Sequence, residues 1–198
     1  MGKIFYIMGK SSSGKDTVYE RLLAREELGL RRVIMYTTRP IRSNETDGVQ
    51  YHFVSIDQME QMNADGKVIE LRRYDTIAGP WYYFTADSQH MNLEQHNYLA
   101  LGTLESFVKM QRYYGKDRVV PIYMEVEDGL RLERALSRER QLLEPRYEEM
   151  CRRFLADQKD FTEEKIQEAG IARRFSNNGS LDVCMDEIMS FISENLDK

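Results

Sequence analysis

The sequence lacks the marks of membrane-spanning, secreted and metal-rich proteins. No apolar run approaches the roughly 18 residues that a membrane span needs, and the run at the amino terminus is too short for a signal peptide. The two cysteines, Cys151 and Cys184, lie 33 positions apart without a C-x-x-C partner or a histidine cluster. This spacing favours reduced structural thiols over a disulfide or a metal site. We therefore expect a cytoplasmic protein that does not bind membranes.

An excess of positive charge is also missing. The chain has 28 lysines and arginines against 33 aspartates and glutamates, a formal net charge of −5 at pH 7. This balance argues against sequence-independent binding of nucleic acid as the main function. The length of 198 residues, with 41% hydrophobic and 31% charged residues, is typical of one globular domain. No internal repeat or low-complexity linker divides it, so we expect a single domain over residues 1–198, as a monomer or a homodimer.

The clearest motif is Gly9-Lys10-Ser11-Ser12-Ser13-Gly14-Lys15-Asp16, which fits the phosphate-loop pattern G-x-x-x-x-G-K. It follows the apolar run Ile4–Met8 and precedes a helical pattern with Val18 and Leu22 on one face. A strand, a glycine-rich turn and a helix in this order predict a site that binds a nucleoside triphosphate. The alternative is an ordinary turn rich in glycine and serine that happens to fit.

The backbone N–H groups of such a loop surround the phosphates, and the N-terminus of the following helix adds its positive dipole end. Lys15 is then placed to reach the β and γ phosphates. The position after this lysine normally holds a Ser or Thr that ligates Mg²⁺, but here it holds Asp16. The predicted ATP-binding residues of this segment are Gly9, Ser11, Ser12, Ser13, Gly14, Lys15, Asp16 and Thr17.

Strand-like and helix-like patterns alternate along the chain, which predicts an α/β fold with a parallel sheet flanked by helices. Strands are expected near residues 4–8, 32–36, 50–54, 67–74, 81–85, 98–101, 118–124 and 173–177. Helical patterns cover residues 14–28, 55–66, 104–113, 127–170 and 181–196. The segment Ile77-Ala78-Gly79-Pro80 is typical of a turn, and Pro145 suits the first turn of a new helix.

A second motif is Thr37-Thr38-Arg39-Pro40-Ile41-Arg42, followed by Glu45, Gly48 and Tyr51-His52-Phe53-Val54. With the phosphate loop before it, the sequence resembles the guanylate kinase family, and the resemblance continues through Ile69-Glu70 and Trp81-Tyr82-Tyr83. It implies a phosphate-loop kinase with a core at residues 1–37, 91–130 and 171–198. It also implies a small β-rich lobe at 38–90 that binds the nucleoside monophosphate, and a helical lid at about 131–160. The implied reaction transfers the γ-phosphoryl group of ATP, with Mg²⁺, to GMP or dGMP.

Four residues of the second region suit the phosphate of the acceptor. Arg39 and Arg42 lie three apart on a loop and can make planar bidentate contacts with a dianionic phosphate. Tyr51 and Tyr83 can donate hydroxyl hydrogen bonds to the same oxygens, a role that the resemblance implies. The alternatives are a solvated loop for the arginines and ordinary strand or core positions for the tyrosines.

Glu70 is the candidate for reading the base. Its carboxylate can accept two hydrogen bonds from N1–H and N2–H₂ of guanine, whereas adenine offers no matching pair of donors on that edge. The resemblance implies the same role and adds the hydroxyl of Thr85. A surface charge at the end of a strand is the alternative for Glu70.

Arginines also recur after residue 130. Arg131, Arg134 and Arg138 are spaced i, i+3 and i+7, so they share one helical face, and Arg153 follows on the next helix. Mobile arginines that close over a triphosphate stabilise the charge that spreads during phosphoryl transfer. The resemblance implies catalytic roles for Lys15, Arg134, Arg138 and Arg153, and an ATP contact for Asn178. An ordinary charged helix face is the alternative.

The sequence departs from the family pattern at several places. Gly102 stands where the family has an acidic residue, Met35 where a hydroxyl residue is usual, and Phe84 where a glycine is usual, and the stretch before Trp81 is about four residues longer. We expect a reshaped acceptor pocket, and we hypothesise that Asp16 supplies the metal-binding carboxylate that the strand lacks. A kinase with another or a broader acceptor, and a catalytically silent module that binds a nucleotide or a protein, are the alternatives to a GMP kinase.

Overall fold

The computed structural model describes residues 2–76, 79–87 and 91–196. The elements along the chain are β1 (Ile4–Met8), α1 (Lys15–Leu23), the 3₁₀-helix η1 (Glu26–Leu28), β2 (Leu30–Arg32), β3 (Tyr36–Thr37), β4 (His52–Phe53), α2 (Ile56–Ala64), β5 (Val68–Thr76), β6 (Gly79–Ala86), β7 (Asn97–Gly102), α3 (Leu104–Tyr114), β8 (Val119–Glu125), α4 (Asp128–Arg140), α5 (Tyr147–Asp160), α6 (Glu163–Glu168), β9 (Arg174–Ser176) and α7 (Leu181–Leu196).

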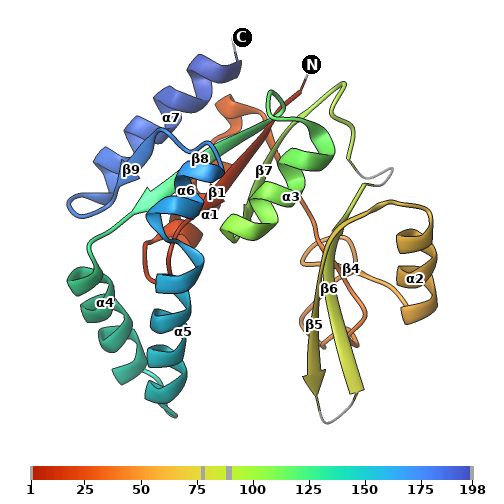
Figure 1. Cartoon of the computed structure of the whole chain (residues 1–198), viewed down its shortest axis with the longest axis horizontal. Coiled ribbons are helices and arrows are strands. Elements are labelled where there is room, and N and C mark those ends of the chain that lie inside the picture. The colour runs from red at the N-terminus through yellow and green to blue at the C-terminus, as the bar shows by residue number, and fades with distance from the viewer. Residues whose placement is uncertain (1, 77–78, 88–90, 197–198) are drawn as a thin grey trace.

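Five parallel strands form the central sheet, in the order β2-β7-β1-β8-β9 (Figure 1). β1 lies in the middle, and all five of its residues are buried. Parallel strands buried on both faces read as continuous apolar runs, which explains the run Ile4–Met8. The predicted α/β fold with a parallel sheet is therefore confirmed.

Helices cover both faces of this sheet. Ile4, Tyr6 and Met8 of β1 point to one face, where they pack in a hydrophobic cluster with residues of α3 and α6. Phe5 and Ile7 point to the other face and pack against α1 and α7. Because successive side chains of a strand alternate between faces, one strand contributes to both cores. The loop after β1 is thereby anchored in the centre of the molecule.

A second, four-stranded sheet has the order β4-β3-β6-β5 and includes the long antiparallel hairpin β5–β6. A separate hydrophobic cluster joins it to α2 through Tyr36, Met59, Phe84 and Ala86. α2 begins after Ser55 because Ser55 and Gln58 form a reciprocal capping box. The helix predicted at 55–66 is confirmed.

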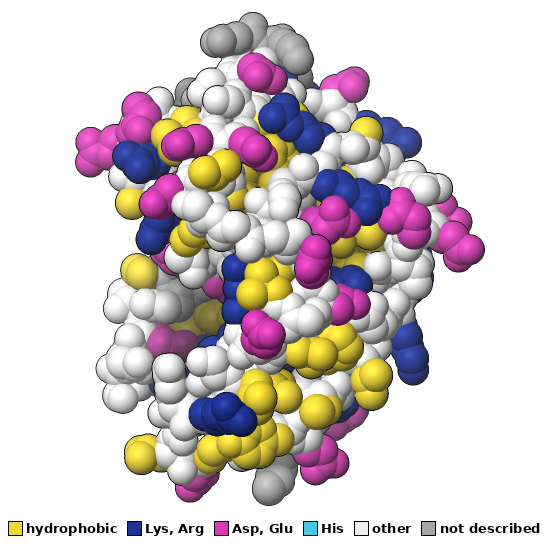
Figure 2. All heavy atoms as spheres, turned by 90° about the vertical axis from the view of Figure 1, so that its left-hand side faces the viewer, with side chains coloured by type: hydrophobic (Ala, Val, Ile, Leu, Met, Phe, Trp, Pro, Cys, Tyr) yellow, Lys and Arg dark blue, Asp and Glu magenta, His cyan; other side chains and the backbone are white. Residues whose placement is uncertain are grey.

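The elements outside the central sheet and its covering helices form two groups, one on each side of the molecule. Figure 1 shows α4 and α5 on one side and the β5–β6 hairpin with α2 on the other. Acidic and basic side chains are interspersed on the face in Figure 2, which also has a hollow walled by hydrophobic and charged groups. Among the described residues, no helix is long and apolar enough to cross a membrane.

Some predicted boundaries are wrong. The strand expected at 32–36 is two strands: β2 pairs with β7 of the central sheet and β3 pairs with β6 of the second sheet, so the chain changes sheets between them. The expected helix 14–28 ends at Leu23 and continues as η1, and β4 covers two residues of the strand expected at 50–54. Pro145 precedes α5 and its N-cap, Arg146, instead of lying in the first turn. Ile77 and Ala78 of the expected turn lie outside the described residues.

Tyr6 fills the space beside Gly102. A β-carbon added at Gly102 would lie 2.1 Å from the Tyr6 hydroxyl oxygen, which no side chain can do without displacing it. The ring is buried and packs against Phe107, with ring centroids 5.6 Å apart. Burial, with a smaller contribution from the charge of Glu70, raises the pKa of the Tyr6 phenol. A neutral hydroxyl thus occupies the volume that a side chain at position 102 would need.

We expect Gly102→Ala to lower the free energy of unfolding by about 1–3 kcal/mol, because it overpacks this site. The same substitution in a Tyr6→Phe background should cost less, since the closest atom is then absent. Urea unfolding of the two single variants, the double variant and the unaltered chain gives the coupling energy.

Gly129→Ala is the matched control. An added β-carbon at Gly129 meets no atom within 4 Å, and the position lies in α4, so the substitution should leave stability unchanged or raise it. An equal cost of Gly102→Ala in both Tyr6 backgrounds would show that the hydroxyl is not the obstacle.

Candidate functional site

The loop between β1 and α1 has two residues in the left-handed region. Gly14 has φ +88°, and a β-carbon there would lie 2.5 Å from the Asn177 side-chain nitrogen, so both backbone and space require glycine. Ser12 has φ +62°, a left-handed conformation that L-residues adopt at a cost. The loop backbone is therefore fixed by local geometry as well as by its neighbours.

Two hydroxyl groups of this loop suit an anion. The side-chain oxygens of Ser12 and Ser13 are buried and have no hydrogen-bond partner among the described residues. Buried polar groups are normally paired, and an unpaired hydroxyl is a ready donor to a phosphate oxygen. Lys15 begins α1, so the N-terminus of that helix faces the same loop.

Lys15 and Asp16 form an ion pair with 3.2 Å between Nζ and Oδ2. The lysine side chain is 17% exposed and the aspartate side chain 77% exposed. The carboxylate therefore remains open to solvent at the start of α1, while the ammonium group is largely enclosed. Such an exposed carboxylate oxygen is a suitable ligand for a hard divalent cation.

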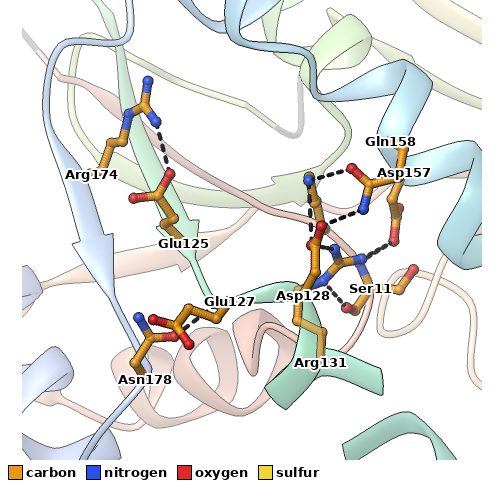
Figure 3. Close-up of polar contacts among 10 residues, drawn as sticks. Ser11, Glu125, Glu127, Asp128, Arg131, Asp157, Gln158, Arg174 and Asn178 are labelled. Carbon is orange, nitrogen blue, oxygen red and sulfur yellow. Dashed lines mark hydrogen bonds and ion pairs between the residues drawn. The ribbon is translucent and has the colours of Figure 1, made fainter. Parts of the chain in front are cut away.

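Helices α4 and α5 contact the loop through a buried arginine, as Figure 3 shows. The side chain of Arg131 is 1% exposed; its Nε donates to the Ser11 carbonyl oxygen at 2.9 Å and its Nη2 to Asp157 Oδ2 at 2.7 Å. The backbone N–H of Ser11 donates to the same Asp157 oxygen at 2.7 Å. Lys10 adds a bond from its Nζ to Gln158 Oε1 at 2.9 Å. Sequence reasoning gave Arg131 no separate role, because its partner Asp157 is 26 positions away.

The predicted lid arginines lie in different surroundings. Arg138 and Arg153 line a small cavity together with Ser11 and Ser12 of the loop. Arg134 instead donates from Nη2 to the Asn177 carbonyl oxygen at 2.9 Å. The structure thus brings two of the three arginines to the loop and turns the third towards the end of β9.

Asn177 and Asn178 each make one hydrogen bond to the backbone of another segment. The predicted residue, Asn178, accepts a hydrogen bond from the backbone N–H of Glu127 at 2.8 Å. Its neighbour Asn177 is buried and donates to the Ser13 carbonyl oxygen at 2.8 Å. Asn177 therefore supports the loop directly, a role that sequence reasoning missed although the two asparagines are adjacent.

Arg39 lies in the loop between β3 and β4, where its side chain is buried and paired with Glu45. Its Nη1 lies 2.7 Å from Glu45 Oε2, its Nη2 contacts Oε1, and its guanidinium lies 5.3 Å from the ring centroids of Tyr51 and Phe53. The hydrogen bond from Arg39 lowers the pKa of Glu45 to about 2. Arg42 is exposed, and its backbone N–H also donates to Glu45. The pair therefore shapes the loop from which Arg42 projects.

Glu70 is nearly inaccessible, at 4% exposed, and its carboxylate has several partners. The hydroxyl of Thr85 donates to Oε1 at 3.3 Å, and the hydroxyl of Ser106, from α3, donates to Oε2 at 3.2 Å. Arg72 Nη2 lies 3.2 Å from Oε1. Glu70 is thus a buried, oriented carboxylate rather than a surface charge at a strand end, and Ser106 ties it to the core.

Two adjoining cavities near helix α1 are lined by three of the six predicted acceptor residues, Tyr51, Tyr83 and Thr85, whereas Arg39, Arg42 and Glu70 are not among their lining residues. A cavity of about 190 Å³ is lined by Asp16, Tyr51 and Thr85, which come from α1, the 47–51 loop and β6. A second cavity, of about 390 Å³, is lined by Tyr51 and Tyr83, whose rings lie edge to face with centroids 5.7 Å apart. Met35 lines both cavities, so they share a wall.

Comparison with known proteins agrees with this geometry. Residues 1–79 match the sequence model of the guanylate kinase family. A guanylate kinase of Neisseria meningitidis is 41% identical over 86 residues, or 43% of this chain and 40% of that protein. A guanylate kinase of Porphyromonas gingivalis is 30% identical over 126 residues, or 63% of this chain and 65% of that protein. Over these parts of its sequence, the chain is similar to guanylate kinases.

The crystal structure of guanylate kinase from Anaplasma phagocytophilum superposes on this chain with a TM-score of 0.61 at 17% identity. The match covers 98% of this chain and 85% of that chain, and at this identity it shows the fold alone. In sequence, the chain spans about two fifths of the length of the first curated guanylate kinases it matches. The predicted resemblance is confirmed, and the sequence match is concentrated in the part that carries the phosphate loop and the Arg39 loop.

The structure explains two departures from the guanylate kinase pattern. Phe84 does not enter the acceptor cavities: it is fully buried against α2's cluster and stacks on Tyr36, with ring centroids 5.1 Å apart. The longer stretch before Trp81 extends the β5–β6 ladder to the pair Thr76 and Gly79. The added residues thus lengthen the hairpin at its turn end, and the sulfur of Met35 contacts Arg72.

The Arg39–Glu45 pair predicts a specific acid sensitivity. Because the pKa of Glu45 falls from the ordinary value of 4.5 to about 2 in the folded chain, its stabilisation is present above pH 4.5 and is lost as the pH falls towards 2. In Glu45→Gln, the Tm measured by circular dichroism should depend less on pH between pH 4.5 and pH 2 than in the unaltered chain.

Glu164→Gln, an exposed substitution on α6, is the control and should keep the unaltered pH dependence. The assignment would be wrong if Glu45→Gln and the unaltered chain lost stability in parallel between pH 4.5 and pH 2.

Proposed function

We propose that the chain is an ATP-dependent nucleoside monophosphate kinase that transfers the γ-phosphoryl group of ATP to GMP or dGMP. The observation that carries this proposal is the placement of the phosphate loop. The loop lines one cavity together with Arg138 and Arg153. Helix α1, which follows the loop, lines another cavity together with Tyr51 and Thr85. A donor and an acceptor bound in these cavities meet at the N-terminus of α1.

The triphosphate is bound by the loop. The backbone N–H groups of Ser12, Gly14 and Lys15 face its phosphates, since those of Ser11 and Ser13 donate to Asp157 and to the Lys10 carbonyl oxygen. The hydroxyls of Ser12 and Ser13 donate to the phosphate oxygens, and Lys15 neutralises charge at the β and γ positions. Asn178 is assigned to the ATP site by the resemblance and lies beside Asn177, which supports the loop. Gly9 and Thr17, at the two ends of this segment, are the remaining residues that we assign to the ATP site.

The acceptor phosphate is bound by Arg42, Tyr51 and Tyr83. Arg42 is exposed on its loop and can make the bidentate contact. Arg39 contributes its charge from a buried position and holds the ring of Tyr51, while Glu45 uses its Nη donors. Glu70 and Thr85 then meet the base, where the carboxylate accepts from N1–H and N2–H₂ of guanine.

The transfer itself needs positioning and charge stabilisation rather than covalent help from the protein. An oxygen of the acceptor phosphate forms the new bond to the γ-phosphorus, the bond from that phosphorus to the β–γ bridging oxygen breaks, and ADP leaves. Lys15, Arg138 and Arg153 stabilise the charge that spreads over the γ-phosphoryl oxygens. Arg134 is assigned to the same lid, which we place at about residues 131–160, facing an acceptor lobe at residues 38–90.

Asp16 fits a metal-binding role. Its carboxylate is exposed at the start of α1, and among the described residues no group of three or more His, Cys, Asp or Glu side chains could hold a metal ion by itself. Mg²⁺ in nucleotide sites takes one or two carboxylates with phosphate oxygens and water, and it neutralises phosphate charge when bound. We therefore assign Asp16 as the protein ligand of Mg²⁺ in the ATP complex.

Steady-state assays test the proposed reaction. ADP release, coupled to NADH oxidation, is measured with ATP, Mg²⁺ and each of GMP, dGMP, AMP, CMP and UMP. We expect turnover with GMP or dGMP, and a loss of kcat/KM on the order of 10²–10³-fold in Lys15→Met, because a charge at the transferred group is removed.

Lys116→Met, on the exposed segment after α3, is the control and should retain activity. Absence of acceptor-dependent ADP release with all five nucleotides would refute the proposed function. Full activity of Lys15→Met would refute the assignment of the loop.

The metal assignment is tested by Asp16→Asn. This substitution removes the charge but keeps the size, so the Mg²⁺ concentration at half-maximal turnover should rise several-fold, with a smaller change at saturating Mg²⁺. Asp186→Asn, an exposed carboxylate on α7, should leave the Mg²⁺ titration unchanged. An unchanged titration in Asp16→Asn would exclude Asp16 as a ligand.

A further inference from the structure

Arg72 stands beside the base-reading carboxylate on one face of the second sheet. In the β5–β6 ladder Glu70 pairs with Thr85, Arg72 with Tyr83 and Tyr74 with Trp81. Alternate residues of a strand point to the same face, so these six side chains line one surface. Arg72 lies between the residues assigned to the base and the aromatic end of the hairpin, and it lines the cavity of about 390 Å³.

The guanidinium of Arg72 is held near the mouth of the base site. Its Nη2 lies 3.2 Å from Glu70 Oε1 and 3.5 Å from the sulfur of Met35. The Arg72 side chain is 34% exposed, whereas the Glu70 side chain is 2% exposed. One member of the pair is therefore fixed inside the sheet and the other reaches the cavity.

Arg72 has hydrogen-bonding capacity that its neighbours use poorly. A guanidinium carries five N–H donors, and a thioether sulfur is a weak acceptor. The Nε of Arg72 is buried and has no partner among the described residues. An arginine in this state gains from an additional oxygen acceptor, and a ligand carbonyl in the adjoining cavity supplies one.

The carboxylate and the guanidinium together present an acceptor next to a donor. The edge of guanine has the complementary order, with N1–H and N2–H₂ as donors and O6 as an acceptor. Adenine has an amino group at position 6, so its donor would face the donors of Arg72. A site that contains both groups therefore selects a 6-oxopurine on two contacts rather than on the carboxylate alone.

We propose that Arg72 is a specificity-determining residue that donates a hydrogen bond to the 6-oxo group of the acceptor base, next to Glu70. This inference rests on the proposed kinase function. It also gives the buried pair a role in both states: Arg72 contacts Glu70 while the base is absent, and the base contacts both groups when it binds.

The experiment compares GMP with its 6-thio analogue, in which sulfur replaces O6 and accepts hydrogen bonds weakly. In the unaltered chain we expect kcat/KM to favour GMP. In Arg72→Met, the KM for GMP should rise about 10- to 100-fold, as expected for the loss of a hydrogen bond to a charged group. The ratio of kcat/KM for GMP to kcat/KM for 6-thio-GMP should fall towards one, and kcat should change much less.

Arg73→Met is the matched control. Arg73 is the next residue of β5, points to the opposite face and pairs with Asp75 in solvent. It should keep both the KM and the preference between the two nucleotides. Arg72→Lys retains a charge and a donor, so it should lie between Arg72→Met and the unaltered chain. Thermal unfolding of each variant shows whether it is folded.

The outcomes separate the possible failures. Equal losses with GMP and 6-thio-GMP in Arg72→Met would mean that Arg72 acts through Glu70 alone, which overturns the direct contact. An Arg72→Met that matches Arg73→Met in every parameter overturns it as well. If the unaltered chain phosphorylates no monophosphate, the proposed function fails, and calorimetric binding of GMP and 6-thio-GMP to the same variants decides the role of Arg72 independently.

Discussion

The rest of the structure depends on the loop between β1 and α1, whose backbone polar groups lie outside any helix or sheet. Such a loop cannot satisfy its polar groups by itself, so distant parts of the chain do so. Asn177 donates to the Ser13 carbonyl from the end of β9, and Arg131 donates to the Ser11 carbonyl from α4. Gly14 lies so close to Asn177 that no side chain fits. Segments more than 100 positions away thus hold a loop of about eight residues.

The central sheet places this loop where two groups of elements can meet it. β1 is buried on both faces and ends at the loop, which fixes the loop relative to both hydrophobic clusters. α4 and α5 approach from one side through Arg131 and Asp157, and the second sheet approaches from the other through the cavity that Asp16 and Thr85 share. Ligand sites at the carboxyl ends of parallel strands are a general property of open α/β sheets.

Much of this arrangement follows from the sequence. The period of apolar residues gave the bounds of α7 and the position of β1, and the capping residues gave the start of α2. The strand at 32–36 could not be divided correctly, because the choice between two sheets depends on β6 and β7, which are far away in sequence. Local patterns carry no information about such a choice.

The candidate site shows the same limit. Tyr51, Tyr83 and Thr85 were predicted from a motif and line adjoining cavities, while Glu70 is buried beside Thr85, which donates a hydrogen bond to it. The roles of all four stay predictions. Arg131 was indistinguishable in sequence from its neighbours on the helix, since its burial results from a contact with Asp157. Tyr6 was hidden in an apolar run, and only the register of β1 against β7 reveals that it takes the space at Gly102.

The hydrogen bond from Ser106 to Glu70 has a mechanical consequence. Ser106 belongs to α3, which packs on the central sheet, and Glu70 belongs to the hairpin of the second sheet. Any rotation of the hairpin about the central sheet must either break this bond or carry α3 along. The direction of the Glu70 carboxylate is thereby coupled to the angle between the two sheets.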